Sequence, residues 1–217
     1  MQDQHCCGQA LRLPLPRGAR VGLLGGSFNP AHAGHVHISK EALRRFGLDR
    51  VVWLVSPMNP LKTQEPASLA DRMDKARQVL GGHPRICVSD FESRADTRYT
   101  AETLALLRRL HPGISFVWLM GADNLAQIHR WRDWQKILND VPVGVLARPG
   151  DRISGRMSKA ARVFRCARLS ARASRLLPAA APPAWCFVNV PMIPLSSTRI
   201  RAAGHWPAAM PLGRAGD

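Results

Sequence analysis

A pair of adjacent glycines and two histidines lie close together near the start of the chain, in the run GGSFNPAHAGH at residues 25–35. Paired glycines let a backbone bend sharply and admit a ligand where a Cβ atom would collide. The imidazoles of His32 and His35, three residues apart, can turn toward the same anion. These residue types at this spacing indicate a phosphate-binding site.

The residues on either side predict the elements that position this run. The apolar stretch 20–24 is typical of a buried strand, and Val36, Leu43 and Phe46 recur at helical spacing over 35–46. The first turn of such a helix carries unpaired N–H groups and about half a positive charge, which favour an anion. The sequence therefore predicts a strand, a glycine turn and a helix, with both histidines at the junction.

Other interpretations of the run are less favoured. A P-loop needs Gly-Lys-Ser/Thr after its glycines, and the dinucleotide fingerprint needs a third spaced glycine and a downstream acid; neither is present. Metal binding by His32, His35 and His37 lacks a nearby Cys or carboxylate to complete the ligand set. A glycine turn with incidental histidines would make most of the pattern an accident.

Composition and charge bound the kind of protein. The 217 residues suit one domain with a sizeable core, and no apolar run approaches the ~18 residues of a membrane span. There are 31 basic and 15 acidic residues, so the net charge is +16. Such an excess attracts polyanions. The basic residues are spread along the chain and do not alternate with aromatics, so we expect small phosphorylated substrates and no specific nucleic acid.

The cysteines and the first residues indicate a location. Five cysteines are an odd number, and none form a CxxC pair, which argues against a disulfide framework and for a reducing cytoplasm. Residues 1–18 lack the apolar core of a signal peptide, and we interpret them as a disordered leader.

Strands and helices alternate along the rest of the chain. Further strands are predicted at 50–55, 85–89, 115–120, 141–146 and 184–188. Helices are predicted over 68–80, where Gly81 and Gly82 stop the helix, and from Thr100, with Thr100 and Thr103 as candidate caps. Another helix is expected to carry Trp131 and Trp134, and 160–177 is either an amphipathic helix or a mobile insert.

This alternation predicts an α/β fold, a Rossmann-like open parallel sheet with helices on both faces. We expect one domain over 19–207, followed by a flexible tail over 208–217. In such sheets the ligand lies at the carboxyl ends of the strands where the winding reverses, here between the first and fourth strands. That point brings 25–35 and the turn at Gly121–Asp123 around one crevice.

The run 25–35 resembles the signature of the HxGH nucleotidyltransferases. More closely, it resembles the nicotinate-nucleotide adenylyltransferases, whose usual form is GG(S/T)F(D/N)PxHxGH. Near the other end, LSSTRIR at 195–201 resembles the ISSTxIR motif of the same family, with Leu195 where isoleucine is usual. Two motifs in the right order make coincidence a poor explanation. Two residues depart from the family pattern: Asn29 replaces the commoner aspartate, and Arg132 stands where an aromatic is often found.

The resemblance implies adenylyl transfer from ATP to the 5′-phosphate of nicotinate mononucleotide, giving nicotinate adenine dinucleotide and pyrophosphate in NAD biosynthesis. It implies that His32, His35 and Arg201 are catalytic, with His35 steadying the α-phosphate. Gly121 and Asp123 would contact the adenosine ribose. The full set expected at ATP is Gly25, Gly26, Ser27, Phe28, His32, His35, Gly121, Asp123, Ser197, Thr198 and Arg201. Mg²⁺ would be carried on ATP, with no metal held by the protein.

The resemblance also implies a pocket for the second nucleotide. Tyr99 and Thr100 match a segment that lines the pyridine pocket, Trp131 matches a tryptophan that stacks on the ring, and Lys62 is a weaker candidate for the mononucleotide phosphate. For Trp131, a position in the hydrophobic core is as good an interpretation as ring stacking. For Thr100, a plain helix cap is as good an interpretation as contact with the ligand. The sequence does not decide between the acid and the amide of the pyridine; the resemblance favours nicotinate.

Three rival functions stay open. Pantetheine-phosphate adenylyltransferases share the second histidine, but generally carry threonine where His32 stands. Class I aminoacyl-tRNA synthetases have a HIGH motif like HAGH, and RMSKA at 156–160 resembles KMSKS, yet 217 residues leave little room for a tRNA-reading domain. A nucleic-acid-binding module is suggested by charge alone. The oligomeric state cannot be inferred from the sequence.

Overall fold

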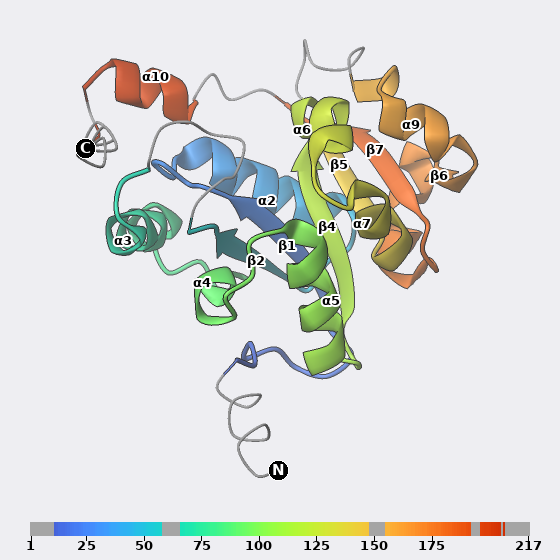
Figure 1. Cartoon of the computed structure of the whole chain (residues 1–217), viewed down its shortest axis with the longest axis horizontal. Helices are drawn as coiled ribbons and strands as arrows, with labels where there is room; N and C mark the ends of the chain where they lie inside the picture. The colour runs from blue at the N-terminus through green and yellow to red at the C-terminus, as the bar shows by residue number, and fades with distance from the viewer. Residues whose placement is uncertain (1–10, 58–65, 148–154, 192–195, 205, 207–217) are drawn as a thin grey trace, which may run out of the picture.

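A computed structural model of the chain describes residues 11–57, 66–147, 155–191, 196–204 and 206 (Figure 1). Lys62, the first ten residues of the leader and the tail 208–217 lie outside this part. Within it, every helix is too short or too polar to span a lipid bilayer.

Seven parallel strands form one sheet in the order β3-β2-β1-β4-β5-β7-β6. The chain therefore winds outward from β1 to β3 and then restarts beside β1 at β4. This confirms the Rossmann-like sheet and puts the reversal between the first and fourth strands. The strands are β1 Arg20–Gly26, β2 Arg50–Val55, β3 Ile86–Ser89, β4 Ser115–Gly121, β5 Val143–Ala147, β6 Arg168–Leu169 and β7 Trp185–Asn189.

Helices cover both faces because the strands are apolar on both sides. On one face lie α2 (Ala33–Arg45), α3 (Leu69–Leu80) and the 3₁₀ segment η3 (Ala171–Ala179). The other face packs against α4 (Phe91–Arg94), α5 (Thr100–Leu110), α6 (Ala122–Gln127), α7 (Trp134–Asp140) and α9 (Lys159–Val163). Two further 3₁₀ segments are η1 (Ile128–Arg130) and η2 (Arg165–Ala167), and α10 (Ser197–Ala202) lies beyond the carboxyl ends of the strands (Figure 1).

Helix ends agree with the sequence in α3 and differ in α5. Ser68 Oγ accepts from the Asp71 amide at 3.1 Å, and Gly81 ends α3 in the left-handed region with φ 57°. In α5 the N-cap is Tyr99, and it makes no side-chain cap bond, so the prediction of Thr100 and Thr103 as caps is wrong. Thr103 is buried inside the helix and its hydroxyl faces Glu92 and Thr97 instead.

The predicted helix carrying Trp131 and Trp134 is wrong, because the chain breaks between them. Helix α6 and η1 end at Trp131, whose backbone is extended (φ −80°, ψ 143°). Asp133 then adopts a left-handed conformation (φ 53°), which Asp tolerates better than most residues, and α7 begins at Trp134. The break puts Trp131 on the wall of a cavity, and both tryptophans pack against the core.

An amphipathic helix was one of two alternatives for 160–177, and it is wrong, because sheet pairing interrupts the segment. Arg168 and Leu169 form the edge strand β6, which pairs with Trp185 and Cys186 of β7. Trp185 Nε1 donates to Phe164 O at 2.7 Å and ties the end of α9 to the sheet. The segment is therefore an edge of the sheet, one strand more than the sequence predicts.

The described part of the leader packs against the domain. Leu13 is buried, and its amide donates to His111 Nε2 at 3.1 Å. The Gly18 amide donates to Gly113 O at 2.9 Å. Residues 11–18 therefore extend the hydrogen bonding of the domain.

Candidate active site

The glycine run lies where strand β1 ends, and close packing against β4 explains one of its glycines. A Cβ atom on Gly25 would collide with the indole of Trp118 in the neighbouring strand. Phe28 follows in the left-handed region (φ 44°) and turns the chain out of the sheet. The run therefore bends at the reversal of the sheet, as the sequence predicts.

The two histidines form the start of helix α2. His32 is its N-cap: His32 Nδ1 accepts from the Gly34 amide at 3.1 Å, and His35 Nδ1 accepts from the His32 amide at 3.2 Å. A neutral imidazole that accepts at Nδ1 carries its proton on Nε2, so both rings have a donor at that nitrogen. The ring centroids are 4.0 Å apart. Both imidazoles are thus held together at the positive end of a helix.

Stacked aromatic rings hold the glycine run in place. Phe28 stacks on Trp53 of β2 with centroids 4.9 Å apart and contacts the His35 ring at 4.9 Å. Trp53 Nε1 donates to Ser39 Oγ at 2.7 Å, and Ser39 Oγ donates to His35 O at 2.8 Å. The strained turn and the second histidine are therefore held by the same buried cluster.

The C-terminal motif docks on the glycine run. Ser197 Oγ donates to Pro30 O at 2.8 Å, and Arg201 donates to Asn29 O. Arg201 Nη2 also lies 3.4 Å from Thr198 Oγ1. The structure thus brings the two motifs, which are far apart in sequence, to the same loop two residues before His32.

Gly121 and Asp123 lie at the end of the adjacent strand β4. Gly121 is the N-cap of α6, and a Cβ atom there would collide with the Asp123 carboxylate. Asp123 itself is exposed in the first turn of α6. Because β4 pairs with β1, these residues and the glycine run share one edge of the sheet.

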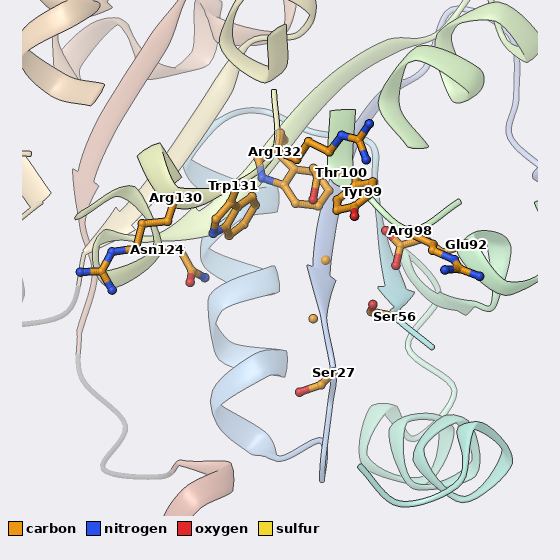
Figure 2. Close-up of a pocket in the computed structure, with 13 residues that line it drawn as sticks. Ser27, Ser56, Glu92, Arg98, Tyr99, Thr100, Asn124, Arg130, Trp131 and Arg132 are labelled. Atoms are coloured by element: carbon orange, nitrogen blue, oxygen red, sulfur yellow. The ribbon is translucent and has the colours of Figure 1, made fainter. Parts of the chain in front are cut away.

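A cavity of about 340 Å³ opens beside the glycine run. Figure 2 shows Trp131 and Asn124 on one side of it and Tyr99, Ser56 and Glu92 on the other. Trp118, also on the wall, has a buried Nε1 without a hydrogen-bond partner among the described residues, a donor that a bound acceptor could satisfy. Six residues expected at the two nucleotides line this cavity: Gly25, Gly26, Ser27, Tyr99, Thr100 and Trp131.

Glu92 is the acidic group among the described residues of this cavity, and no sequence pattern pointed to it. The residue is 8% exposed, and burial raises its pKa to about 7. Hydrogen bonds from Ser56 and Thr103 lower the pKa, but by less than burial raises it. The Thr103 hydroxyl lies 3.3 Å from Glu92 Oε1. At neutral pH this side chain therefore exists in both protonation states.

Arg72 is the second group that the sequence interpretation missed. Its side chain on α3 is 1% exposed, and burial lowers its pKa. In the described part of the chain its partners are carbonyls: Ala67 O at 2.8 Å, Ser27 O at 2.8 Å, Ser56 O at 2.7 Å and Pro57 O at 3.0 Å. One guanidinium thus joins the loops that follow β1 and β2. The signal was a charged residue on the otherwise apolar face of α3, between Leu69, Met73 and Ala76.

Within the described ranges, His, Cys, Asp and Glu side chains nowhere gather in groups of three that could hold a metal ion. His37, the next histidine after the run, lies 3.1 Å from Pro191 O through its Nε2. Lys62 lies outside the described residues.

Known proteins with similar sequences and folds share one activity in their names. The Cytidylyltransferase-like family model matches residues 23–203. A probable nicotinate-nucleotide adenylyltransferase from Ruegeria pomeroyi is 62% identical over 192 residues, 88% of this chain and 90% of that protein. One from Cereibacter sphaeroides is 63% identical over 186 residues, 86% of this chain and 98% of that protein. The Plasmodium falciparum nicotinic acid mononucleotide adenylyltransferase complexed with NaAD has a similar fold, with TM-score 0.66 at 16% identity over 85% of this chain and 83% of that one.

Replacing Arg72 tests whether its guanidinium holds the two loops. Arg72→Met keeps much of the length but removes four hydrogen bonds from a buried guanidinium. We therefore expect the free energy of unfolding to fall by at least about 3 kcal/mol, since each hydrogen bond from a charged group contributes about 1.5–3 kcal/mol. Urea unfolding measures the loss. Arg77→Met is the control, because Arg77 lies on the same helix with an exposed side chain paired to Asp74. Equal stability of the two variants would contradict the role of Arg72.

Glu92 predicts a pH dependence of stability. Its pKa in the folded protein, about 7, exceeds the ordinary 4.5, so its favourable contribution is complete below pH 4.5 and is lost as pH rises through 7. Relative to Glu92→Gln, the wild type should therefore lose up to about 3 kcal/mol of unfolding free energy between pH 4.5 and 8.5. Urea unfolding of both proteins across this range measures the difference. The exposed Glu102→Gln on α5 is the control, and a pH-independent difference for Glu92→Gln would contradict the burial argument.

Proposed function

The chain belongs to the nicotinate-nucleotide adenylyltransferase family, and we propose that it transfers the adenylyl group of ATP to the 5′-phosphate of nicotinate mononucleotide. The products are nicotinate adenine dinucleotide and pyrophosphate, a step of NAD biosynthesis. The observation that carries this proposal is the paired imidazoles of His32 and His35 at the start of α2, beside the bent glycine run at the reversal of the sheet.

The reaction is an in-line displacement at phosphorus. An oxygen of the mononucleotide 5′-phosphate attacks the α-phosphorus of ATP, the bond from that phosphorus to the β-phosphate bridging oxygen breaks, and pyrophosphate leaves with the electron pair. Such transfers depend on aligning two polyanions and stabilising spread charge, so they need no protein nucleophile. This explains a site composed of imidazoles, a helix N-terminus, hydroxyls and guanidinium groups.

The phosphates of ATP would lie over the start of α2. His32 and His35 would donate to them, with His35 steadying the α-phosphate as charge builds. Ser197, Thr198 and Arg201 would hold the β- and γ-phosphates, since α10 docks on Asn29 and Pro30 of the same loop. Arg201 is suited to phosphate oxygens because its donors form a fixed fork.

Each nucleoside would occupy a different part of the crevice. Gly121 and Asp123, at the end of β4, would contact the adenosine ribose through the exposed carboxylate of Asp123. The pyridine nucleotide would enter the cavity, where Trp131 would stack on its ring and Tyr99 and Thr100 would line the opposite wall. Gly25, Gly26, Ser27 and Phe28 would lie between them, and Lys62 would meet the mononucleotide phosphate.

The cofactor and the location follow from the same reaction. Mg²⁺ would arrive bound to the triphosphate of ATP, with water completing its octahedral shell, and the protein residues would bind the phosphates. We propose that the reaction takes place in the cytoplasm, because an odd number of cysteines without CxxC spacing argues for a reducing compartment.

Pyrophosphate release from Mg-ATP tests the proposal. The full chain should release pyrophosphate with nicotinate mononucleotide and form the dinucleotide, detectable by chromatography. Release with phosphopantetheine in place of nicotinate mononucleotide would contradict the proposal and favour a pantetheine-phosphate adenylyltransferase. Release that requires an amino acid and tRNA would favour the synthetase-like alternative.

Removing His35 should slow the reaction without unfolding the protein. We expect His35→Ala to lower kcat by about 10²–10³, because its partner is the phosphate at which charge develops. Steady-state kinetics measure the loss, and thermal unfolding checks the fold. His37→Ala is the matched control, because His37 lies on the same helix and faces Pro191. Near-normal turnover of His35→Ala would remove this residue from the mechanism.

A further inference from the structure

Three arginines flank the aromatic walls of the cavity. Arg98 precedes Tyr99, and Arg130 and Arg132 stand on either side of Trp131. All three are exposed and line the cavity. Glu92 is the single acid among the described residues that line it, so arginine charge outweighs acidic charge around the opening.

Arg132 differs from the other two in its orientation. Its guanidinium carbon lies 4.6 Å from the centre of the Tyr99 ring, a cation–π contact that holds the charge against the cavity wall. Figure 2 shows the Arg132 side chain reaching toward Tyr99, whereas Arg130 and Arg98 extend away on opposite outer sides. The extended backbone at Trp131 and the left-handed turn at Asp133 fix the course of the chain on either side of Arg132.

The position of Arg132 next to Trp131 places its guanidinium near the substituent of a bound pyridine ring. Under the proposed function the pyridine ring stacks on Trp131, the residue before Arg132, with Tyr99 on the opposite wall. A carboxylate on that ring would be repelled by ionised Glu92 and attracted by the guanidinium at Tyr99. An amide carries no charge, so it gains a hydrogen bond at most from the same group.

We propose that the side chain of Arg132, held over Tyr99, makes the enzyme prefer a pyridine nucleotide with a carboxylate over the corresponding amide. This role rests on the proposed function and assigns its substrate preference to one residue. Arg132 is a specificity-determining residue and takes no part in phosphoryl transfer. Lysine would keep the charge without the planar contact to Tyr99, so it should restore only part of the preference.

The test compares kcat/KM for nicotinate mononucleotide and nicotinamide mononucleotide at saturating Mg-ATP. In Arg132→Gln we expect kcat/KM for the acid to fall at least about tenfold, since hydrogen bonds to charged groups are the stronger ones. The value for the amide should stay within about twofold. Arg132→Lys should be intermediate.

Two controls separate this role from general charge effects. Arg130→Gln removes a charge at the same cavity, and Arg109→Gln removes one from the exposed side of α5; both should leave the acid-to-amide ratio unchanged. An equal drop of the ratio in all three variants would overturn the proposal in favour of long-range attraction. An acid preference that survives Arg132→Gln would overturn the role of Arg132 and leave the proposed function standing. A wild-type enzyme that used neither nucleotide would overturn both.

Discussion

The site depends on one buried guanidinium. The chain leaves the sheet at the ends of β1 and β2, and Ser27, Ser56 and Pro57 follow these ends. Arg72 donates to the carbonyls of all three from helix α3. A buried charge needs such partners, and partly buried carbonyls outside the strand pairing need a donor, so one side chain satisfies both requirements. The glycine run can therefore bend away from the sheet and still have a defined course.

Asn29 connects the glycine run to residues near the C-terminal end of the chain. Its Oδ1 accepts from the Ala67 amide at 3.3 Å and from Trp206 Nε1 at 2.6 Å, while its backbone carbonyl accepts from Arg201. The family usually has aspartate here, and asparagine keeps the accepting oxygen without its charge. The C-terminal motif is thus positioned by neutral acceptors of the glycine loop. Anion-binding groups from both ends of the sequence meet because one short loop supplies those acceptors.

The sequence predicts what depends on local pattern and misses what depends on tertiary contacts. Continuous apolar strands and paired glycines predicted the sheet, its reversal and the first helix, because these follow from periodicity and backbone freedom. The predicted helix through Trp131 is wrong because tertiary packing at the cavity overrides helical propensity there. Glu92 lies in a four-residue helix that is too short for any periodicity to show. Arg72 was visible only as a charge on an apolar face. Three of its four carbonyl partners come from the loops after β1 and β2, 15 to 45 residues away along the chain.

The excess positive charge, +16 in total, is distributed unevenly over the described structure. In the described part of the chain, acidic partners pair with arginines remote from the cavity, as in Arg20–Asp49 and Arg108–Asp140. Within the same described residues the cavity arginines Arg98, Arg130 and Arg132 form no ion pair, and Glu92 is the single acid on the cavity wall. The Tyr99 hydroxyl and, after it, the carboxylates of Glu102 and Asp133 raise the pKa of Arg132, so its charge is offset only in part. Clefts with one dominant sign of charge raise the local concentration of oppositely charged ligands. Both proposed substrates are anionic phosphates, so an arginine-rich chain with its acids placed elsewhere favours their entry without a polyanionic partner.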